Sequence, residues 1–165
     1  MNIVYRTPCQ YLPALLVLLF LTLLTGCANT QLASKEEDAL AKQFSPPADR
    51  SYIYIIRESA IRGQAIHLSI SIDRGVVGAI QNKTYALVDV KPGKHIVEVG
   101  NSVNGKGPNL DFLHPLRINL ETLPGRSYFI AGHLTMGTPD IKVIPESQGR
   151  SLIVDKNFKR VKTLF

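Results

Sequence analysis

The 165-residue sequence lacks the motifs that mark several common classes of enzyme. It contains no Gly-x-Ser-x-Gly elbow, which presents the nucleophile of many serine hydrolases, and no phosphate-binding loop. Gly105-Lys106-Gly107 is not such a loop, because no Ser or Thr follows the lysine and no strand-to-helix pattern surrounds it. The carboxylates are spread along the chain without an evident acid–base pair. We therefore expect a protein that is not an enzyme and that carries no cofactor.

Residues that bind metal ions are few and widely separated. No two of the four histidines stand at His-x-His or His-x-x-x-His spacing: His67, His95, His114 and His133. The chain has only two cysteines, Cys9 and Cys27. We expect no metal site. The alternative is a zinc site assembled from distant histidines together with Asp73, Asp89 or Asp111.

Basic residues outnumber acidic ones, but they are not arranged as in a nucleic-acid-binding protein. The chain has 19 Lys and Arg against 13 Asp and Glu, a net charge of +6. The densest basic group lies near the C-terminus and comprises Lys156, Lys159, Arg160 and Lys162. A nucleic-acid surface would combine a basic stripe with interleaved aromatic residues, and that combination is missing. We expect no nucleic-acid partner and interpret the charges as solvated, beside an anionic membrane surface.

The longest apolar run lies near the N-terminus and is too short to span a bilayer. Leu12–Leu24 contains 13 residues, whereas a spanning helix needs about 20. Arg6 precedes the run, and the polar residues Asn29, Thr30 and Gln31 follow shortly after Cys27. These features predict the hydrophobic region of a signal peptide, residues 1–26.

The end of this segment resembles the lipobox of bacterial lipoproteins, with Leu24, Thr25 and Gly26 ahead of Cys27. The resemblance implies cleavage between Gly26 and Cys27, and acylation of Cys27 by palmitate-type chains. Two or three such chains give a stable membrane anchor. Ala28 follows the cysteine, which by resemblance to enterobacterial sorting favours the periplasmic face of the outer membrane. An ordinary secretory signal and an uncleaved anchor are the alternatives.

Cleavage at this site would leave a single domain without a free thiol. Cys9 would leave with the signal, and Cys27 would be blocked by lipid. Cysteine nucleophiles, disulfides and cysteine-bound metals are then excluded. The loss of Arg6 leaves 18 basic residues against 13 acidic ones, a net charge of +5. The mature length suits one domain.

Residues 27–50 are expected to form a tether with one short helix. Ser34-Lys35-Glu36-Glu37 has the Ser-x-x-Glu spacing of a capping box, which marks a helix N-terminus. Ser45-Pro46-Pro47 ends the helix and stiffens the entry to the domain at residues 51–165.

The domain itself has the pattern of short strands. Ile66–Ile72 alternates strictly, with four apolar side chains on one face and His67, Ser69 and Ser71 on the other. Strands are predicted at 52–57, 66–72, 76–80, 85–90, 95–99, 116–121, 127–131, 141–144 and 151–154. About seven to nine short strands indicate an all-β fold, an antiparallel sandwich of the Ig-like or transthyretin-like kind. A small barrel is the alternative, and residues 157–165 are expected to form a short helix or a tail.

Turn signals separate these strands. Asp73-Arg74-Gly75 predicts a tight hairpin, while Lys91-Pro92-Gly93-Lys94 and Leu123-Pro124-Gly125-Arg126 predict two similar corners. Proline fixes φ at the first central position of such a turn, and glycine supplies a positive φ at the second.

The order of these segments resembles family 2846 of the domains of unknown function, which is found in bacterial lipoproteins. The likeness covers roughly Ser51 to Val143. It implies a β-sandwich lipoprotein domain. It implies no activity, so it assigns no catalytic residue.

The sequence thus favours a membrane-anchored binding or structural module of the bacterial cell envelope. The expected partners are the membrane, through acylated Cys27, and an envelope protein, peptidoglycan or another glycan. The glycine-rich loop from Asn101 to Asn109 is the expected contact surface, because loops on rigid scaffolds often carry binding. Its candidate contact residues are Asn101, Asn104, Lys106 and Asn109. A subunit of a secretion or assembly machine, and an envelope hydrolase with an unrecognised site, are the alternatives.

Overall fold

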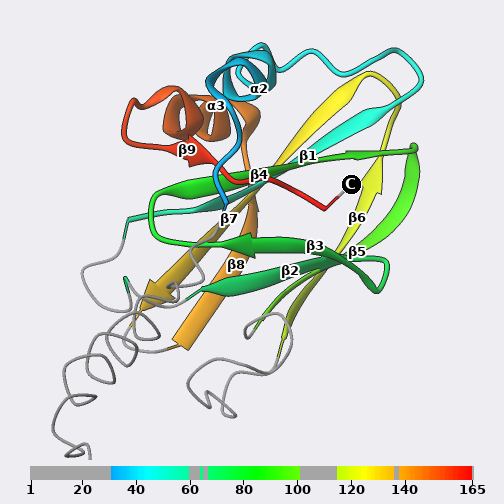
Figure 1. Cartoon of the computed structure of the whole chain (residues 1–165). Coiled ribbons are helices and arrows are strands. Elements are labelled where there is room, and N and C mark those ends of the chain that lie inside the picture. Colours follow the sequence, from blue (N-terminus) through cyan, green and yellow to red (C-terminus); the bar gives the residue numbers. More distant parts are fainter. Residues whose placement is uncertain (1–30, 60–63, 65–66, 101–114, 136–137, 165) are drawn as a thin grey trace, which may run out of the picture.

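The computed structural model describes residues 31–59, 64, 67–100, 115–135 and 138–164 (Figure 1). In chain order the elements are α2 (Lys35–Ala41), β1 (Ser51–Arg57), β2 (Leu68–Ile72), β3 (Gly75–Ile80), β4 (Thr84–Val90), β5 (Gly93–Gly100), β6 (Leu116–Thr122), β7 (Arg126–Thr135), β8 (Thr138–Ile144), α3 (Glu146–Val154) and β9 (Lys159–Arg160). The strands agree closely with those predicted, apart from the C-terminal region.

The strands form two sheets that face each other, which confirms the predicted β-sandwich. One sheet has the order β8-β7-β1-β4-β9 and the other the order β3-β2-β5-β6. Most neighbouring strands are antiparallel, but β1 pairs with β7 in parallel, and so does β4 with β9. Figure 1 shows α2 and α3 on the outer side of the five-stranded sheet.

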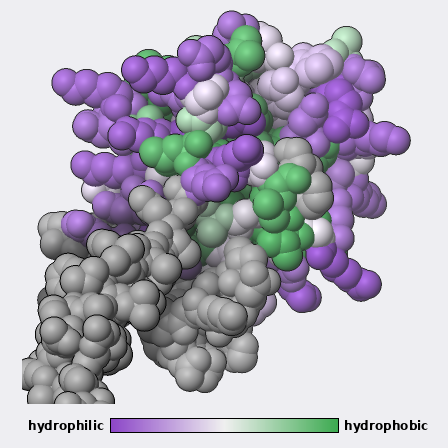
Figure 2. Space-filling view, viewed as in Figure 1, coloured by the Kyte–Doolittle hydropathy of each residue, from purple (hydrophilic) through white to green (hydrophobic). Residues whose placement is uncertain are grey.

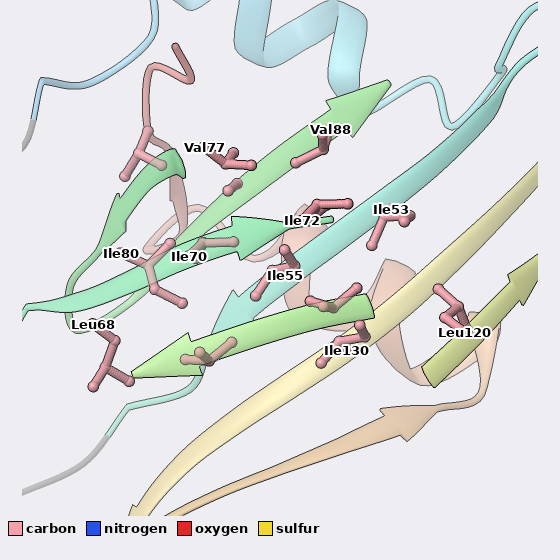
Figure 3. Close-up of a cluster of buried hydrophobic side chains, with 14 of the residues drawn as sticks. Ile53, Ile55, Leu68, Ile70, Ile72, Val77, Ile80, Val88, Leu120 and Ile130 are labelled. Atoms are coloured by element: carbon pink, nitrogen blue, oxygen red, sulfur yellow. The ribbon is translucent and has the colours of Figure 1, made fainter. Parts of the chain in front are cut away.

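The main core lies between the two sheets (Figure 3). Alternation in each strand turns one row of side chains inward, so that β-branched residues and leucines from both sheets interdigitate. Ile53 and Ile55 of β1, and Ile70 of β2, are fully buried there.

A second core lies on the opposite face of the five-stranded sheet, beneath the helices. Tyr54 and Ile56 of β1 are fully buried on this face, together with Phe129 of β7. The rings of Tyr54 and Phe129 stack with centroids 4.9 Å apart and an interplanar angle of 8°. Strand β1 therefore has no solvent-exposed face, and the domain has three layers.

Residues 151–154 are part of helix α3, so the prediction of a strand there is wrong. Local β-branched residues suggest a strand, but Ile153 is fully buried in the second core as part of a helix. One signal indicates the helix. Glu146 and Arg150 stand one helical turn apart, and Arg150 Nε donates to Glu146 Oε1 at 2.8 Å.

The C-terminal residues form neither the helix nor the free tail that was expected. Strand β9 pairs with β4, and Val161 is fully buried in the main core. Beyond it, the N–H of Leu164 donates to the carbonyl of Val77 at 2.9 Å. The segment thus closes the side of the sandwich between β4 and β3.

The N-terminal described residues pack on the domain as well. The capping box of α2 is confirmed, since Ser34 Oγ accepts from Glu37 N–H at 3.1 Å and Glu37 Oε2 accepts from Ser34 N–H at 2.8 Å. Leu32 forms an antiparallel bridge with Val161. The stretch 31–50, which was expected to be a tether, therefore contacts the folded domain from Gln31 onward.

Candidate functional site

The residues that the sequence singled out lie outside the described part of the chain. This applies to the cleavage and acylation site at Gly26 and Cys27, and to the four loop residues Asn101, Asn104, Lys106 and Asn109. The structure does place the two ends of that loop. It connects Gly100 at the end of β5 with Leu116 at the start of β6.

A groove of about 590 Å³ crosses β5 and β6 near the opposite end of the same pair of strands. It is lined by Asp73, Lys94, His95, Ile96, Asn119, Leu120 and Glu121. Val97 points into the main core, so Lys94 and Ile96 have side chains on the outer face of the four-stranded sheet. Ile96 is 45% exposed and is surrounded by polar side chains that can both donate and accept hydrogen bonds. Figure 2 shows that apolar residues on the visible face are exposed only in small, separate groups.

The hairpin between β2 and β3 forms one wall of this groove. Asp73 and Arg74 both have positive φ, at 51° and 70°, which is the conformation of a tight type I′ turn. The turn brings the Asp73 carboxylate to β5, where Oδ1 accepts a 2.9 Å hydrogen bond from the N–H of Ile96. The N–H of Asp73 donates in return to the carbonyl of Ile96 at 3.0 Å.

The imidazole of His95 lies between the turn and the β4–β5 corner. Its Nδ1 is 2.7 Å from Oδ2 of Asp73, and its Nε2 is 2.8 Å from the carbonyl oxygen of Lys91. Each ring nitrogen therefore faces an oxygen atom of this chain. The side chain is only 11% exposed. A general base needs a ring nitrogen that faces the substrate, and here both nitrogens are occupied. The pair therefore connects the β2–β3 turn with the β4–β5 corner, and we call it the His95–Asp73 clasp.

The Asp73 carboxyl responds to opposing influences. Partial burial raises its pKa, but the hydrogen bonds from His95 and from the Ile96 N–H outweigh burial, so the pKa lies below its ordinary value. The carboxylate is thus held in its charged form beside His95.

Comparison with known proteins places the chain in a family. Residues 47–145 match the family described as "Protein of unknown function (DUF2846)". The chain belongs to this family. An uncharacterized protein of Haemophilus influenzae is 30% identical over 140 residues, which cover 82% of this chain and 77% of the relative. The resemblance seen in the sequence is confirmed as far as the family is concerned.

The span that matches DUF2846 contains strands β1 to β8, so it includes the groove and the His95–Asp73 clasp. Helices α2 and α3 and strand β9 flank it. The helices that cover the outer face of the five-stranded sheet therefore lie outside the segment that matches DUF2846.

Other ionisable groups of this DUF2846 protein hold elements together. His133 Nε2 lies 3.5 Å from Glu58 Oε2, and Arg117 pairs with Glu98 across β6 and β5. Among the residues that the structure describes, no three His, Cys, Asp or Glu side chains gather as a metal site would require. The same residues include no helix that is long and apolar enough to cross a membrane.

Sequence reasoning missed the groove, although one signal was present. The alternation in 116–121 places Asn119 and Glu121 on one face of β6. Only the pairing of Lys94 with Glu121 and of Ile96 with Asn119 shows which residues of β5 stand beside them.

Proposed function

We propose that this protein is a lipid-anchored lipoprotein of the bacterial envelope that works by binding a partner in the periplasm. The anchor is Cys27, held at the periplasmic face of the outer membrane. The contact surface is the groove around Ile96, and the partner is an envelope protein, peptidoglycan or another glycan. The Asn101–Asn109 loop, at the other end of β5 and β6, stays a second candidate contact region.

One observation carries this proposal, which is the composition of the groove. An exposed isoleucine surrounded by a lysine, an asparagine and a glutamate combines an apolar contact with groups that fix orientation. Binding is favoured over hydrolysis because the histidine in the groove has both ring nitrogens bonded to acceptors of its own chain.

The anchor is tested by labelling cells with a palmitate analogue and separating membranes from soluble periplasm. The parent chain is expected to carry the label and to sediment with outer membranes. A Cys27→Ala variant is expected to lose the label and, where its signal is still processed, to enter the soluble fraction. An unlabelled parent chain would contradict the lipoprotein assignment.

The groove is tested by in-cell photocrosslinking. A photoreactive amino acid at Asn119 is expected to capture a discrete partner, identified by mass spectrometry. The matched control is the same amino acid at Gln148, which is exposed on α3 in the opposite layer. Equal capture from both positions, or none from Asn119, would contradict the groove assignment. A partner that belongs to a secretion or assembly machine would identify the alternative role.

A further inference from the structure

Gln31 lies at one edge of the five-stranded sheet and is very close in sequence to the proposed anchor. The carbonyl of Gln31 accepts a 2.8 Å hydrogen bond from the N–H of Lys162, next to β9. Four steps of the chain separate Gln31 from Cys27. An extended chain spans at most about 3.5 Å per residue, so the two Cα atoms lie within about 14 Å of each other. The reach between the domain and the proposed acylated cysteine is therefore much shorter than a tether of residues 27–50 would give.

Exposed lysines gather at this same edge. Lys159 lies in β9, and its N–H donates to the carbonyl of Lys83 at 3.3 Å. Lys162 is bonded through its backbone to Gln31, and Lys156 lies in the turn that leads into β9. We call Lys83, Lys156, Lys159 and Lys162 the basic edge. All four are exposed, and none of them forms an ion pair within the described part of the chain.

Four acidic residues lie near this edge: Glu36, Glu37, Asp38 and Asp155. The hydrogen bond from the N–H of Ser34 is the largest cause that lowers the pKa of Glu37, and attraction to Arg160 and Lys162 lowers it further. Asp155 accepts the N–H of Asn157 at 2.8 Å, while Glu36 is exposed. Arg160 and Lys35 add positive charge beside the basic edge, so six basic residues stand against these four acidic ones and the edge is cationic overall.

We propose that the basic edge binds the anionic lipid headgroups of the membrane that holds the Cys27 anchor. The proposal rests on the proposed lipid anchor for its geometry, because acylation brings the edge to the bilayer. Each lysine near an anionic surface strengthens binding about fivefold, and salt weakens the effect. Leu32, which is 43% exposed and pairs with Val161 at the same edge, adds an apolar contact for the interface. The protein would then present a fixed orientation, with its groove on the other sheet.

The affinity of the surface itself is measured on the mature chain with Cys27→Ala, which has no lipid. The probes are vesicles of phosphatidylcholine alone and of phosphatidylcholine mixed with phosphatidylglycerol, and the readout is co-sedimentation at low and at physiological salt. We expect binding to the anionic vesicles only. A variant with Lys156→Glu, Lys159→Glu and Lys162→Glu is expected to bind them at least tenfold more weakly.

The matched control reverses three exposed cations elsewhere: Lys91→Glu, Arg126→Glu and Lys142→Glu. Val90 and Arg126 both pair with Ser51 at the far end of β1, and β8 is the opposite edge of the sheet from β9. The control is expected to bind within about twofold of the parent, since its charges lie roughly 20 Å or more from the basic edge. Circular dichroism and urea unfolding confirm that each variant is folded, and Lys→Gln at the same three sites serves where the Glu variant fails to fold.

Two results would overturn the proposal: no preference of the parent for anionic vesicles, or equal losses in the basic-edge and control variants. The anchor is judged separately by palmitate labelling. Labelling without vesicle binding would contradict only the proposal that the basic edge binds lipid headgroups. Vesicle binding without labelling would support that proposal and contradict the Cys27 anchor.

Discussion

The hydroxyl of Tyr85 donates a 2.6 Å hydrogen bond to Oδ1 of Asp38, which joins helix α2 to strand β4. The same carboxylate oxygen accepts the N–H of Arg160 at 3.2 Å, and Oδ2 lies 2.7 Å from the ammonium of Lys42. One side chain thus connects α2, β4 and β9. A second tyrosine repeats the link, because the hydroxyl of Tyr54 donates to the carbonyl of Ala41 at 2.7 Å. Burial is the first cause that raises the pKa of both tyrosines, so both remain protonated donors.

Removal of the Tyr85 hydroxyl is expected to loosen this junction. Tyr85→Phe leaves the ring in the second core but deprives a partly buried carboxylate of a donor, so we expect a loss of about 1–2 kcal/mol in the free energy of unfolding. Urea unfolding followed by circular dichroism measures it. Tyr52→Phe, at a half-buried position on the same sheet, is the control, with a change below about 0.5 kcal/mol. Equal losses would show that the Asp38 contact contributes nothing.

Acid is expected to weaken the same junction. Burial raises the pKa of Asp38, but the hydrogen bonds from Lys42 and Tyr85 outweigh burial and hold the pKa below its ordinary value. A lowered folded-state pKa means that the stabilisation is complete above the unfolded value of about 3.9 and disappears as the pH falls through the folded value.

The Asp38→Asn variant should therefore be less stable than the parent at neutral pH, and the difference should shrink as the pH falls below the unfolded value of about 3.9. Urea unfolding across this pH range measures the difference. The exposed Asp49→Asn serves as the control and is expected to follow the parent throughout. A difference that stays constant with pH would argue against a charged Asp38 in the junction.

The hairpin turn between β2 and β3 offers a stabilising substitution. Arg74 has φ 70°, a conformation that costs a residue with a Cβ roughly 1 kcal/mol and costs glycine nothing. Arg74→Gly creates the Asp-Gly pair that type I′ turns favour, so the free energy of unfolding should rise by about 0.5–1 kcal/mol. The control is Glu121→Gly in β6, where the added backbone freedom should destabilise by a similar amount. A thermal melt of the three proteins compares them, and a lower melting temperature for Arg74→Gly would contradict the turn assignment.

Helix α3 touches β7 at a glycine. A Cβ on Gly149 would lie 2.3 Å from two carbon atoms of the Phe129 ring. Alanine favours helices over glycine by about 1 kcal/mol, but this overlap forces the helix away from the sheet. We expect Gly149→Ala to lower the free energy of unfolding by about 1–3 kcal/mol.

Ser151→Ala, at an exposed site on the same helix, is the matched control and should be neutral or slightly stabilising. Urea unfolding measures both. If Gly149→Ala were as stable as Ser151→Ala, α3 would not rest on the Phe129 ring.

Local features of the sequence were sufficient for much of the fold. The alternation in β2 predicts a strand with one buried face, and Leu68, Ile70 and Ile72 are buried as expected. The Ser34–Glu37 spacing predicts the start of α2, and Gly125 adopts the positive φ, 68°, that its turn requires. Each of these features is decided by neighbours within about four residues, so the sequence contains the whole signal.

Other features depend on contacts between residues far apart in the chain. From the sequence alone, Tyr54 and Ile56 could lie on a half-exposed face of β1. They are buried because α2 and α3 cover that face. The groove is lined where the β2–β3 turn meets β5 and β6, and there Asp73 contacts His95, 22 residues away in the chain.

The sequence by itself determined where β1 to β8, their turns and the first helix lie, and it contains the signal-like N-terminus with Cys27. The tertiary structure decided that residues 151–154 are helical, that the C-terminal segment is a strand, and that the chain from Gln31 onward packs on the domain. The reason is physical. A local pattern sets only the backbone preference of a segment. The free energy gained by burying Ile153 and Val161 against distant strands is larger than the free energy of that preference.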